Sequence, residues 1–306
     1  KQAAEAAYDI IKQKTDLGLD LVPYPQIFND VNNQKAEVIL YRPTGESGDF
    51  EKANFPIGVE GGKTSTCPTQ NLMEAYDMKD GTPFVWNNQS NPYDNRDPRM
   101  KYTIVCNEMK WPVDPVEIWE GGTNGLPLQN ATTTGYYLKK YVNNTISFEA
   151  GSTVTKKQHN WVLFRYGEIL LNYAEAMINA FHDPNYKDAV YNMSAREAVN
   201  QIRGRTNISL PGFPSDITEK DFVKRLKNER RVELAFEGHR FWDVRRWKEL
   251  GQTANIYGVK ITKNNEVISY EKFLLETRAV TDNMYFYPIP NTERFKNPNL
   301  GQNPGW

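Results

Sequence analysis

The sequence predicts a mostly α-helical protein in which helices at both ends of the chain flank a long, loop-rich middle segment. Two observations carry this prediction. Apolar residues recur at helical spacing in residues 1–14, 160–181 and 194–208. Between about residues 45 and 159, Gly, Pro, Asn and Thr instead cluster between short apolar runs, which is typical of loops with a few short strands.

The chain can be followed element by element. After the Ala-rich helix of residues 1–14, two prolines in "LVPYPQIF" end the helical pattern, and "KAEVILYR" favours a strand. In the middle segment, "PTQNLMEAYDM" favours a helix, while "MKYTIVC" and "TGYYLKKYV" favour short strands. "NWVLFRYGEILLNYAEAMINAF" and "SAREAVNQIRGRTNI" then predict two further helices.

Small residues on these helices suit close antiparallel pairs of the tetratricopeptide kind, although no 34-residue repeat follows that consensus faithfully. We therefore expect one unit over 1–306 with three parts. Residues 1–44 supply a helix and a strand of the scaffold, 45–159 form a loop-rich ligand-binding subdomain, and 160–306 form the helical scaffold and a C-terminal tail. Because the Pro- and Asn-rich tail could not fold by itself, we expect it to lie along the body.

Composition excludes several functional classes. With 37 Lys and Arg against 38 Asp and Glu, the chain has no basic stripe of the kind that nucleic acid requires. No apolar run is long enough to predict a membrane-spanning helix. The three histidines form no zinc motif, and no Asp-x-Asp-x-Asp-Gly run supports a calcium site, so we expect neither metal nor cofactor. Cys67 and Cys106 could be bridged or reduced.

The most charged stretch, "KNERRVELAFEGHRFWDVRRWKEL", occupies residues 227–250. On one continuous helix, Arg230, Glu233, Glu237 and Arg240 fall in a single stripe, while apolar residues point in almost every direction. A helix of that kind is normally surrounded by protein, so these four residues predict a buried structural ion network. The alternative is a glycoside hydrolase that uses Glu233 and Glu237, but arginine neighbours keep carboxyl groups ionised, which is poor for a general acid. We therefore expect no catalytic residues.

Aromatic and amide side chains in the middle segment predict a binding site for neutral polar ligands. Sugar rings stack on aromatic faces, while their hydroxyl groups need amide or carboxylate partners. The candidate ligand-binding residues are Trp86, Asn87, Asn88, Tyr93, Trp111, Trp119 and Asn124. For each tryptophan, packing inside the loops is the competing interpretation.

Several segments, taken in order, resemble the SusD/RagB family of surface nutrient-binding lipoproteins. These are "LVPYPQIF" with "EVILYR", "PTQNLMEAYDMKDGTP", "NPYDNRDPRMKYTIV", "TGYYLKKYV", "RYGEILLNYAEAMINA", "AVNQIRGRTNI", "LKNERRVELAFEGHRFWDVRRWKEL" and "YPIPNTERFKNPNLGQNPGW". The resemblance runs over essentially the whole chain. It lacks the family's N-terminal part with its signal peptide, lipidated cysteine and further helices, so we expect a processed or truncated chain.

This resemblance implies tetratricopeptide-like pairs on one side and ligand-holding loops on the other. It also implies a non-enzymatic protein at the outer membrane that faces the exterior and is anchored by a lipid on the N-terminal part. Such proteins act as the lid of a SusC-type TonB-dependent transporter and capture oligosaccharides, as in polysaccharide utilization, or peptides in the RagB branch. A pure protein-interaction scaffold is a further alternative.

Overall fold

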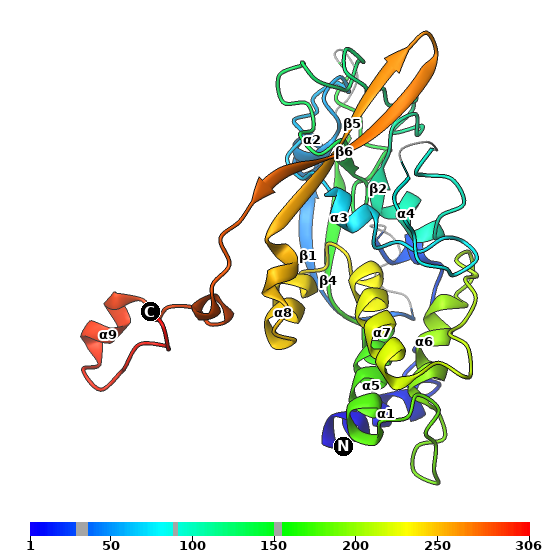
Figure 1. The fold of residues 1–306 in the computed structure, drawn as a ribbon, viewed down its shortest axis with the longest axis vertical. Coiled ribbons are helices and arrows are strands. Elements are labelled where there is room, and N and C mark those ends of the chain that lie inside the picture. The colour runs from blue at the N-terminus through cyan, green and yellow to red at the C-terminus, as the bar shows by residue number, and fades with distance from the viewer. Residues whose placement is uncertain (29–35, 88–90, 150–154) are drawn as a thin grey trace.

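The computed structural model describes residues 1–28, 36–87, 91–149 and 155–306. Helices α1 (Gln2–Lys12), α5 (Tyr166–Phe181), α6 (Ala195–Arg203) and α7 (Glu219–Glu233) gather at one end of the molecule (Figure 1). Helix α5 lies at the centre of this group and contacts α1, α6 and α7. The prediction of a mostly α-helical fold is confirmed.

Small residues bring these helices close together. Ala4, Ala174 and Ala198 are fully buried in one apolar core that also holds the stacked rings of Tyr8 and Tyr173. Helices α6 and α7 begin at polar caps. Ser194 and Glu197 form a capping box on α6, and the side chain of Thr218 accepts a hydrogen bond from the backbone N–H of Asp221 on α7.

The other half of the molecule is loop-rich and has its own core. It contains short helices α2 (Asp49–Asn54), α3 (Gln70–Met73) and α4 (Pro98–Thr103), and the 3-10 turn η1 (Tyr24–Phe28). Strand β1 (Val38–Ser47) pairs with β4 (Lys157–Arg165), and β2 (Ile104–Val105) pairs with β3 (Tyr137–Leu138), both antiparallel. The predicted helix of residues 160–181 is therefore wrong in its first six residues, which belong to β4, and α5 begins only at Tyr166.

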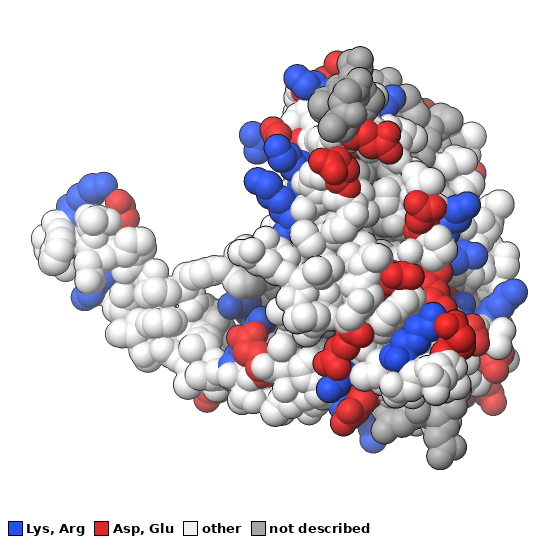
Figure 2. Space-filling model, turned by 90° about the horizontal axis from the view of Figure 1, so that it is seen from above, with Lys and Arg blue, Asp and Glu red and all other residues white. Residues whose placement is uncertain are grey.

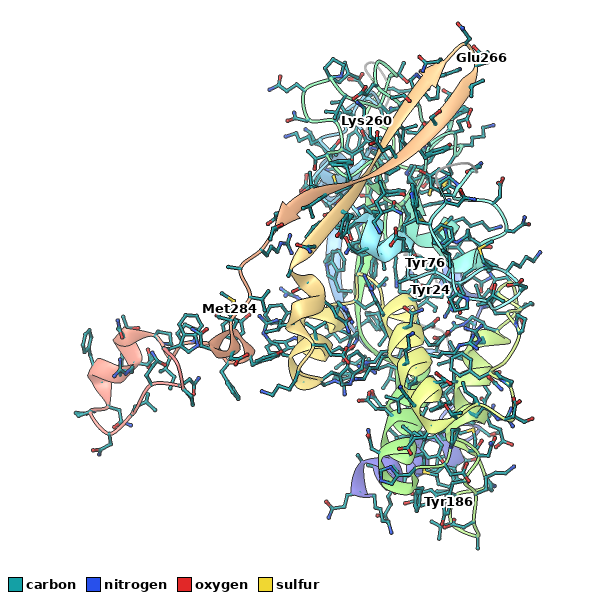
Figure 3. All side chains as sticks on the ribbon, in the orientation of Figure 1. Tyr24, Tyr76, Tyr186, Lys260, Glu266 and Met284 are labelled. Atoms are coloured by element: carbon teal, nitrogen blue, oxygen red, sulfur yellow. The ribbon has the colours of Figure 1, made fainter. Side chains whose placement is uncertain are left out.

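A long hairpin that the sequence pattern did not predict rises over the loop-rich half. Strands β5 (Asn255–Asn264) and β6 (Val267–Thr277) are joined by Asn265 and Glu266, which both have positive φ, as a tight two-residue hairpin turn requires. Figure 3 labels Lys260 and Glu266 on this hairpin. Its backbone is tied to the loops, because the Val259 N–H donates to the Thr134 carbonyl at 2.9 Å.

The expectation of one continuous helix over residues 227–250 is wrong. Helix α7 ends at Glu233, and helix α8 spans His239–Arg246. Between them the backbone turns through two left-handed residues, Phe236 with φ 62° and Gly238 with φ 85°. Such a turn interrupts the helix, so residues on the two sides of it do not share a helical face.

The C-terminal tail, residues 282–306, forms an arm that extends away from the body (Figures 1 and 2). It contains the 3-10 turn η3 (Asp282–Tyr285) and helix α9 (Asn291–Lys296), and the 3-10 turn η2 (Leu250–Thr253) lies earlier, between α8 and β5. The prediction that the tail lies along the body is therefore wrong. Amide side chains hold the arm together instead: Gln302 hydrogen-bonds to both the N–H and the carbonyl of Ile289.

Two further findings bear on the sequence expectations. Cys67 and Cys106 are both free thiols. In the described ranges, every helix is too short or too polar to cross a bilayer.

Candidate functional site

Three buried arginines converge on Glu233 at the junction of the two halves. Its Oε1 accepts hydrogen bonds from Arg165 at 2.8 Å and Arg205 at 2.7 Å, and its Oε2 accepts one from Arg99 at 2.8 Å. All four side chains are at most 1% exposed. These arginines hold the pKa of Glu233 far below its ordinary value, against the opposing effect of burial.

Glu237, in the turn that follows α7, is also held by buried cations. It accepts hydrogen bonds from the guanidinium of Arg165 and, at 2.8 Å, from the Nζ of Lys140. These cations lower the pKa of Glu237, although burial opposes them. Lys140 is itself buried, and burial lowers its pKa to about 8. Tyr24, labelled near the middle of the molecule in Figure 3, accepts a hydrogen bond from the same ammonium.

The predicted network of Arg230, Glu233, Glu237 and Arg240 is thus different from the one observed. Arg230 pairs with Asp243 of α8 at 2.9 Å. Arg240 contacts neither glutamate; its Nη2 donates to Gln252 at 2.9 Å. The expected stripe required a continuous helix, and the turn at Gly238 separates Arg240 from it. The cations that hold the two glutamates come from distant parts of the chain.

This cluster cannot serve the hydrolase alternative in the observed geometry. A general acid needs a carboxyl group with a raised pKa that faces an open cleft. Both glutamates are buried, their pKa values are lowered, and their oxygens already accept hydrogen bonds from cations. The cluster therefore positions the surrounding segments.

Next to the cluster, the loop-rich half contains a recess of about 150 Å³. Its wall includes Tyr102, Trp111, Tyr141, Asn143, Asn144 and His159. The rings supply apolar faces, and the amides and imidazole supply hydrogen-bonding groups, a combination that suits a polar ligand with CH faces. The indole Nε1 of Trp111 is buried and finds no hydrogen-bond acceptor in the described part of the chain.

The side chains around the recess are fixed by packing. The ring of Tyr141 packs edge-to-face against Phe28, with centroids 4.9 Å apart, and lies 5.0 Å from the ring of Trp161. The Nζ of Lys139 lies 4.8 Å from the ring centroid of Trp111. Burial lowers the pKa of Lys139 as well.

Of the six candidate ligand-binding residues that the structure describes, only Trp111 lines this recess, and its side chain is itself buried in the core of the loop-rich half. Trp86, Tyr93 and Trp119 are half-buried and pack against the core of the loop-rich half. Asn87 is exposed, and Asn88 lies outside the described residues.

Asn124 is used inside the fold. Its Oδ1 accepts a hydrogen bond from the Glu117 N–H at 2.8 Å, and its Nδ2 donates to the Ile57 carbonyl at 2.6 Å. The side chain is buried, so it joins two loops rather than facing solvent.

Sequence reasoning missed most of the recess. Tyr102, Asn143 and His159 come from three separate segments. Only the aromatic and polar run around Tyr141 offered a local signal for the recess, and its pattern predicts a strand.

The molecule thus has paired helices on one side and irregular loops with a polar, aromatic recess on the other. This is the architecture that the sequence resemblance implied. The comparison with family models identifies the class of protein: the model of the SusD family matches residues 27–306, and the chain belongs to this family. The SusD-like protein P2 of Formosa agariphila is 29% identical over 163 residues, which are 51% of this chain and 28% of that protein.

Solved structures show the same fold. A SusD-like protein of Bacteroides fragilis is 26% identical with a TM-score of 0.77, over 99% of this chain and 63% of that one. A second B. fragilis structure, described as a SusD-like carbohydrate-binding protein, is 24% identical with a TM-score of 0.77, over 97% of this chain and 60% of that one. The chain thus spans less than two thirds of the relatives that it matches.

Proposed function

We propose that this chain captures oligosaccharides at the outer surface of a bacterium and delivers them to a SusC-type TonB-dependent transporter in the outer membrane, without catalysing a reaction. In this proposal the longer protein is a lipoprotein anchored through an N-terminal segment. Membership of the SusD family supports the proposal, as does the resemblance in the order of the sequence motifs. The observation that carries it is the aromatic and amide-lined recess beside Trp111.

The recess offers the contacts that a sugar requires. The half-buried ring of Tyr102 offers a stacking surface, and the mostly buried indole of Trp111 forms part of the wall. Asn144 is exposed at the recess, and among the described residues its amide makes no hydrogen bond. A ligand hydroxyl can therefore pair with this amide without displacing a contact of the fold.

Calorimetric titration of the chain against oligosaccharides and peptides tests the proposal. We expect a glycan to bind, and Asn144→Ala to weaken that binding roughly fivefold, the effect of about 1 kcal/mol for one lost hydrogen bond. Asn299→Ala, which removes an exposed amide from the arm, is the matched control and leaves the affinity unchanged. Thermal melts of both variants should match the unsubstituted chain, since both side chains are exposed.

Other outcomes point elsewhere. Binding of peptides and of no glycan would replace the proposal with RagB-like peptide uptake. Release of new reducing ends from a polysaccharide would instead support the hydrolase, provided that it is lost in a Glu233→Gln variant whose thermal melt shows it to be folded. The delivery step needs the full-length protein: its co-purification with a SusC-type transporter is expected, and failure to associate with one in detergent extracts would contradict that part.

A further inference from the structure

A second hollow, separate from the recess, lies along helix α7. It has a volume of about 470 Å³, which falls in the range of small-molecule sites, about 300–1,000 Å³. One wall is α7, and the other is the segment from Glu74 to Phe84 that follows α3; Arg240, Glu249 and Gln252 close the end. We call this hollow the α7 cleft.

The α7 cleft is strongly basic. Six basic side chains line it, against three acidic ones. The basic residues are Lys220, Lys224, Arg225, Lys227, Arg231 and Arg240. This local excess contrasts with the chain as a whole, whose formal net charge is −1.

The acidic side chains of the cleft already have cationic partners. Glu249 lies 2.6 Å from the Nζ of Lys227. Glu74 pairs at 2.7 Å with Lys272 of the hairpin. The third, Asp77, lies about equally close to two guanidinium groups, Arg203 at 3.5 Å and Arg225 at 3.6 Å.

The remaining basic side chains have no such partner. Arg231 donates through Nη2 to the Asn71 carbonyl at 2.8 Å, and Arg240 donates to the Gln252 side chain at 2.9 Å, so both pair with neutral acceptors. Lys220 and Lys224 are exposed, and within the described ranges neither forms an ion pair. Four cations thus face a cleft whose carboxylates are already in use.

The two arginines also repel each other. Burial is the main reason that the pKa of Arg231 falls to about 10, and the guanidinium of Arg240 lowers it further. Burial likewise lowers the pKa of Arg240, and the nearby carboxylates of Glu249 and Asp243 offset only part of that effect. Two positive charges held together in a half-buried hollow create a field that an anion would relieve. Guanidinium groups also match the planar oxygens of carboxylate and the oxygens of sulfate in two-point contacts.

An apolar surface lies beside these charges. Phe84 and Pro83 form part of the wall, and Phe84 is held in place because Arg96 stacks on its ring at 3.6 Å. A ring and a proline next to guanidinium groups can contact the CH face of a sugar while the cations contact its acidic group.

We propose that the α7 cleft binds an acidic sugar unit, whose carboxylate or sulfate group is held by Arg231 and Arg240 and attracted by Lys220 and Lys224. This proposal rests on the proposed glycan-binding function and narrows the ligand to acidic oligosaccharides. It also gives Arg240 a role outside the ion network. Because Arg240 pairs with neither Glu233 nor Glu237, its guanidinium can bind a ligand.

The test compares ligands that differ only in charge. An oligogalacturonide is titrated beside its carboxyl-reduced form, a sulfated oligosaccharide beside its desulfated form, and inorganic sulfate alone as a third arm. We expect the acidic form to bind roughly tenfold or more tightly than its neutral counterpart, since hydrogen bonds to charged groups are the stronger kind. The two pairs show whether carboxylate or sulfate is preferred, and their preference should weaken as salt is raised.

Matched variants locate the effect. Arg240→Gln should reduce the ratio of acidic-form to neutral-form affinity by roughly tenfold or more. Lys224→Gln, at an exposed position that folding does not need, should reduce the same ratio severalfold. Arg42→Gln, an exposed strand residue outside the cleft, changes the net charge by the same amount and should leave the preference intact. Binding of a neutral glycan should be the same in all three.

The outcomes separate the two proposals. Equal affinity for acidic and neutral forms, or equal losses in Arg240→Gln and Arg42→Gln, would overturn the acidic-sugar site while leaving glycan binding in place. Binding of inorganic sulfate as tight as that of the whole sulfated oligosaccharide would reduce the cleft to a simple anion site and also overturn it. Absence of binding to every glycan, acidic or neutral, would refute the proposed function itself.

Discussion

Replacement of Glu233 by Gln tests the structural role of the ion cluster. Glu233 is fully buried, and its two oxygens accept hydrogen bonds from Arg99, Arg165 and Arg205. Gln has nearly the same shape, so the substitution opens no cavity. It removes the negative charge and turns one acceptor into an N–H donor that faces a guanidinium.

The magnitude follows from what is left behind. Breaking a buried ion pair by removing one partner costs about 3–5 kcal/mol, because the remaining charge is buried without compensation. Each arginine keeps at least one further carboxylate, so the loss should not exceed that range. Arg205 keeps Glu37, Arg165 keeps Glu37 and Glu237, and Arg99 keeps Asp97 and Glu229. Since a whole domain is stable by about 5–15 kcal/mol, the variant should be marginal, with a melting temperature lower by on the order of 10 °C.

Urea unfolding followed by tryptophan fluorescence measures this effect. Glu266→Gln is the matched control, because Glu266 lies in the turn of the hairpin with its side chain 89% exposed and paired with Lys263 at 3.0 Å. We expect the control to lose less than about 1 kcal/mol, as surface pairs do. If Glu233→Gln were as stable as the control, the cluster would have to be solvated, and the hydrolase alternative would regain support.

Two further predictions concern pH and the loops. The pKa of Glu233 is lowered in the folded state, so as pH falls this carboxyl group becomes protonated in the unfolded chain first. The contribution of Glu233 to stability is therefore present above pH 4.5 and is lost as pH falls below that value. The pKa of Asp77 is raised to about 6, so the contribution of Asp77 to stability is instead lost as pH rises through 6. The urea midpoint should therefore be followed as pH is lowered from 4.5: we expect the midpoint to fall, and a rise would contradict the prediction. Asn124→Ala should cost about 2–4 kcal/mol, because the Glu117 N–H and the Ile57 carbonyl lose a buried partner. A thermal melt checks this, and an unchanged melting temperature would mean that the amide is not needed to join the loops.

Local patterns predicted the elements that depend on local physics. Helices α1, α5 and α6 follow from apolar spacing, and their ends were predicted to within a few residues except where β4 precedes α5. The turn at Gly238 was visible as a glycine, but a glycine in a helical pattern is tolerated as often as it ends the helix. The β5–β6 hairpin was missed because its alternation of apolar and charged residues is irregular.

The candidate site could not be predicted in the same way, because its parts meet only in the folded chain. The aromatic and amide composition directed attention to the loops, yet a tryptophan that packs and one that faces a ligand look alike in sequence. Trp111 is buried, borders the recess and has Lys139 4.8 Å from its ring centroid, whereas the half-buried Trp119 has as its neighbour Lys263 of the hairpin, 4.6 Å from its ring centroid. That neighbour is fixed by a strand that the sequence did not reveal.

The buried cluster explains how irregular loops can hold a site in a fixed place. Apolar packing is non-directional and allows neighbouring segments to slide, whereas guanidinium–carboxylate contacts fix both distance and angle. The cluster joins the paired strands β1 and β4 to the helices α4 and α7, through Glu37 before β1, Arg165 at the end of β4, Arg99 in α4 and Glu233 at the end of α7. Lys140 belongs to both features, because it pairs with Glu237 and also lines the recess. The two glutamates of the charged stretch that resembles a catalytic row therefore hold the segments around the recess in place, while Arg240, which contacts neither glutamate, lines the α7 cleft.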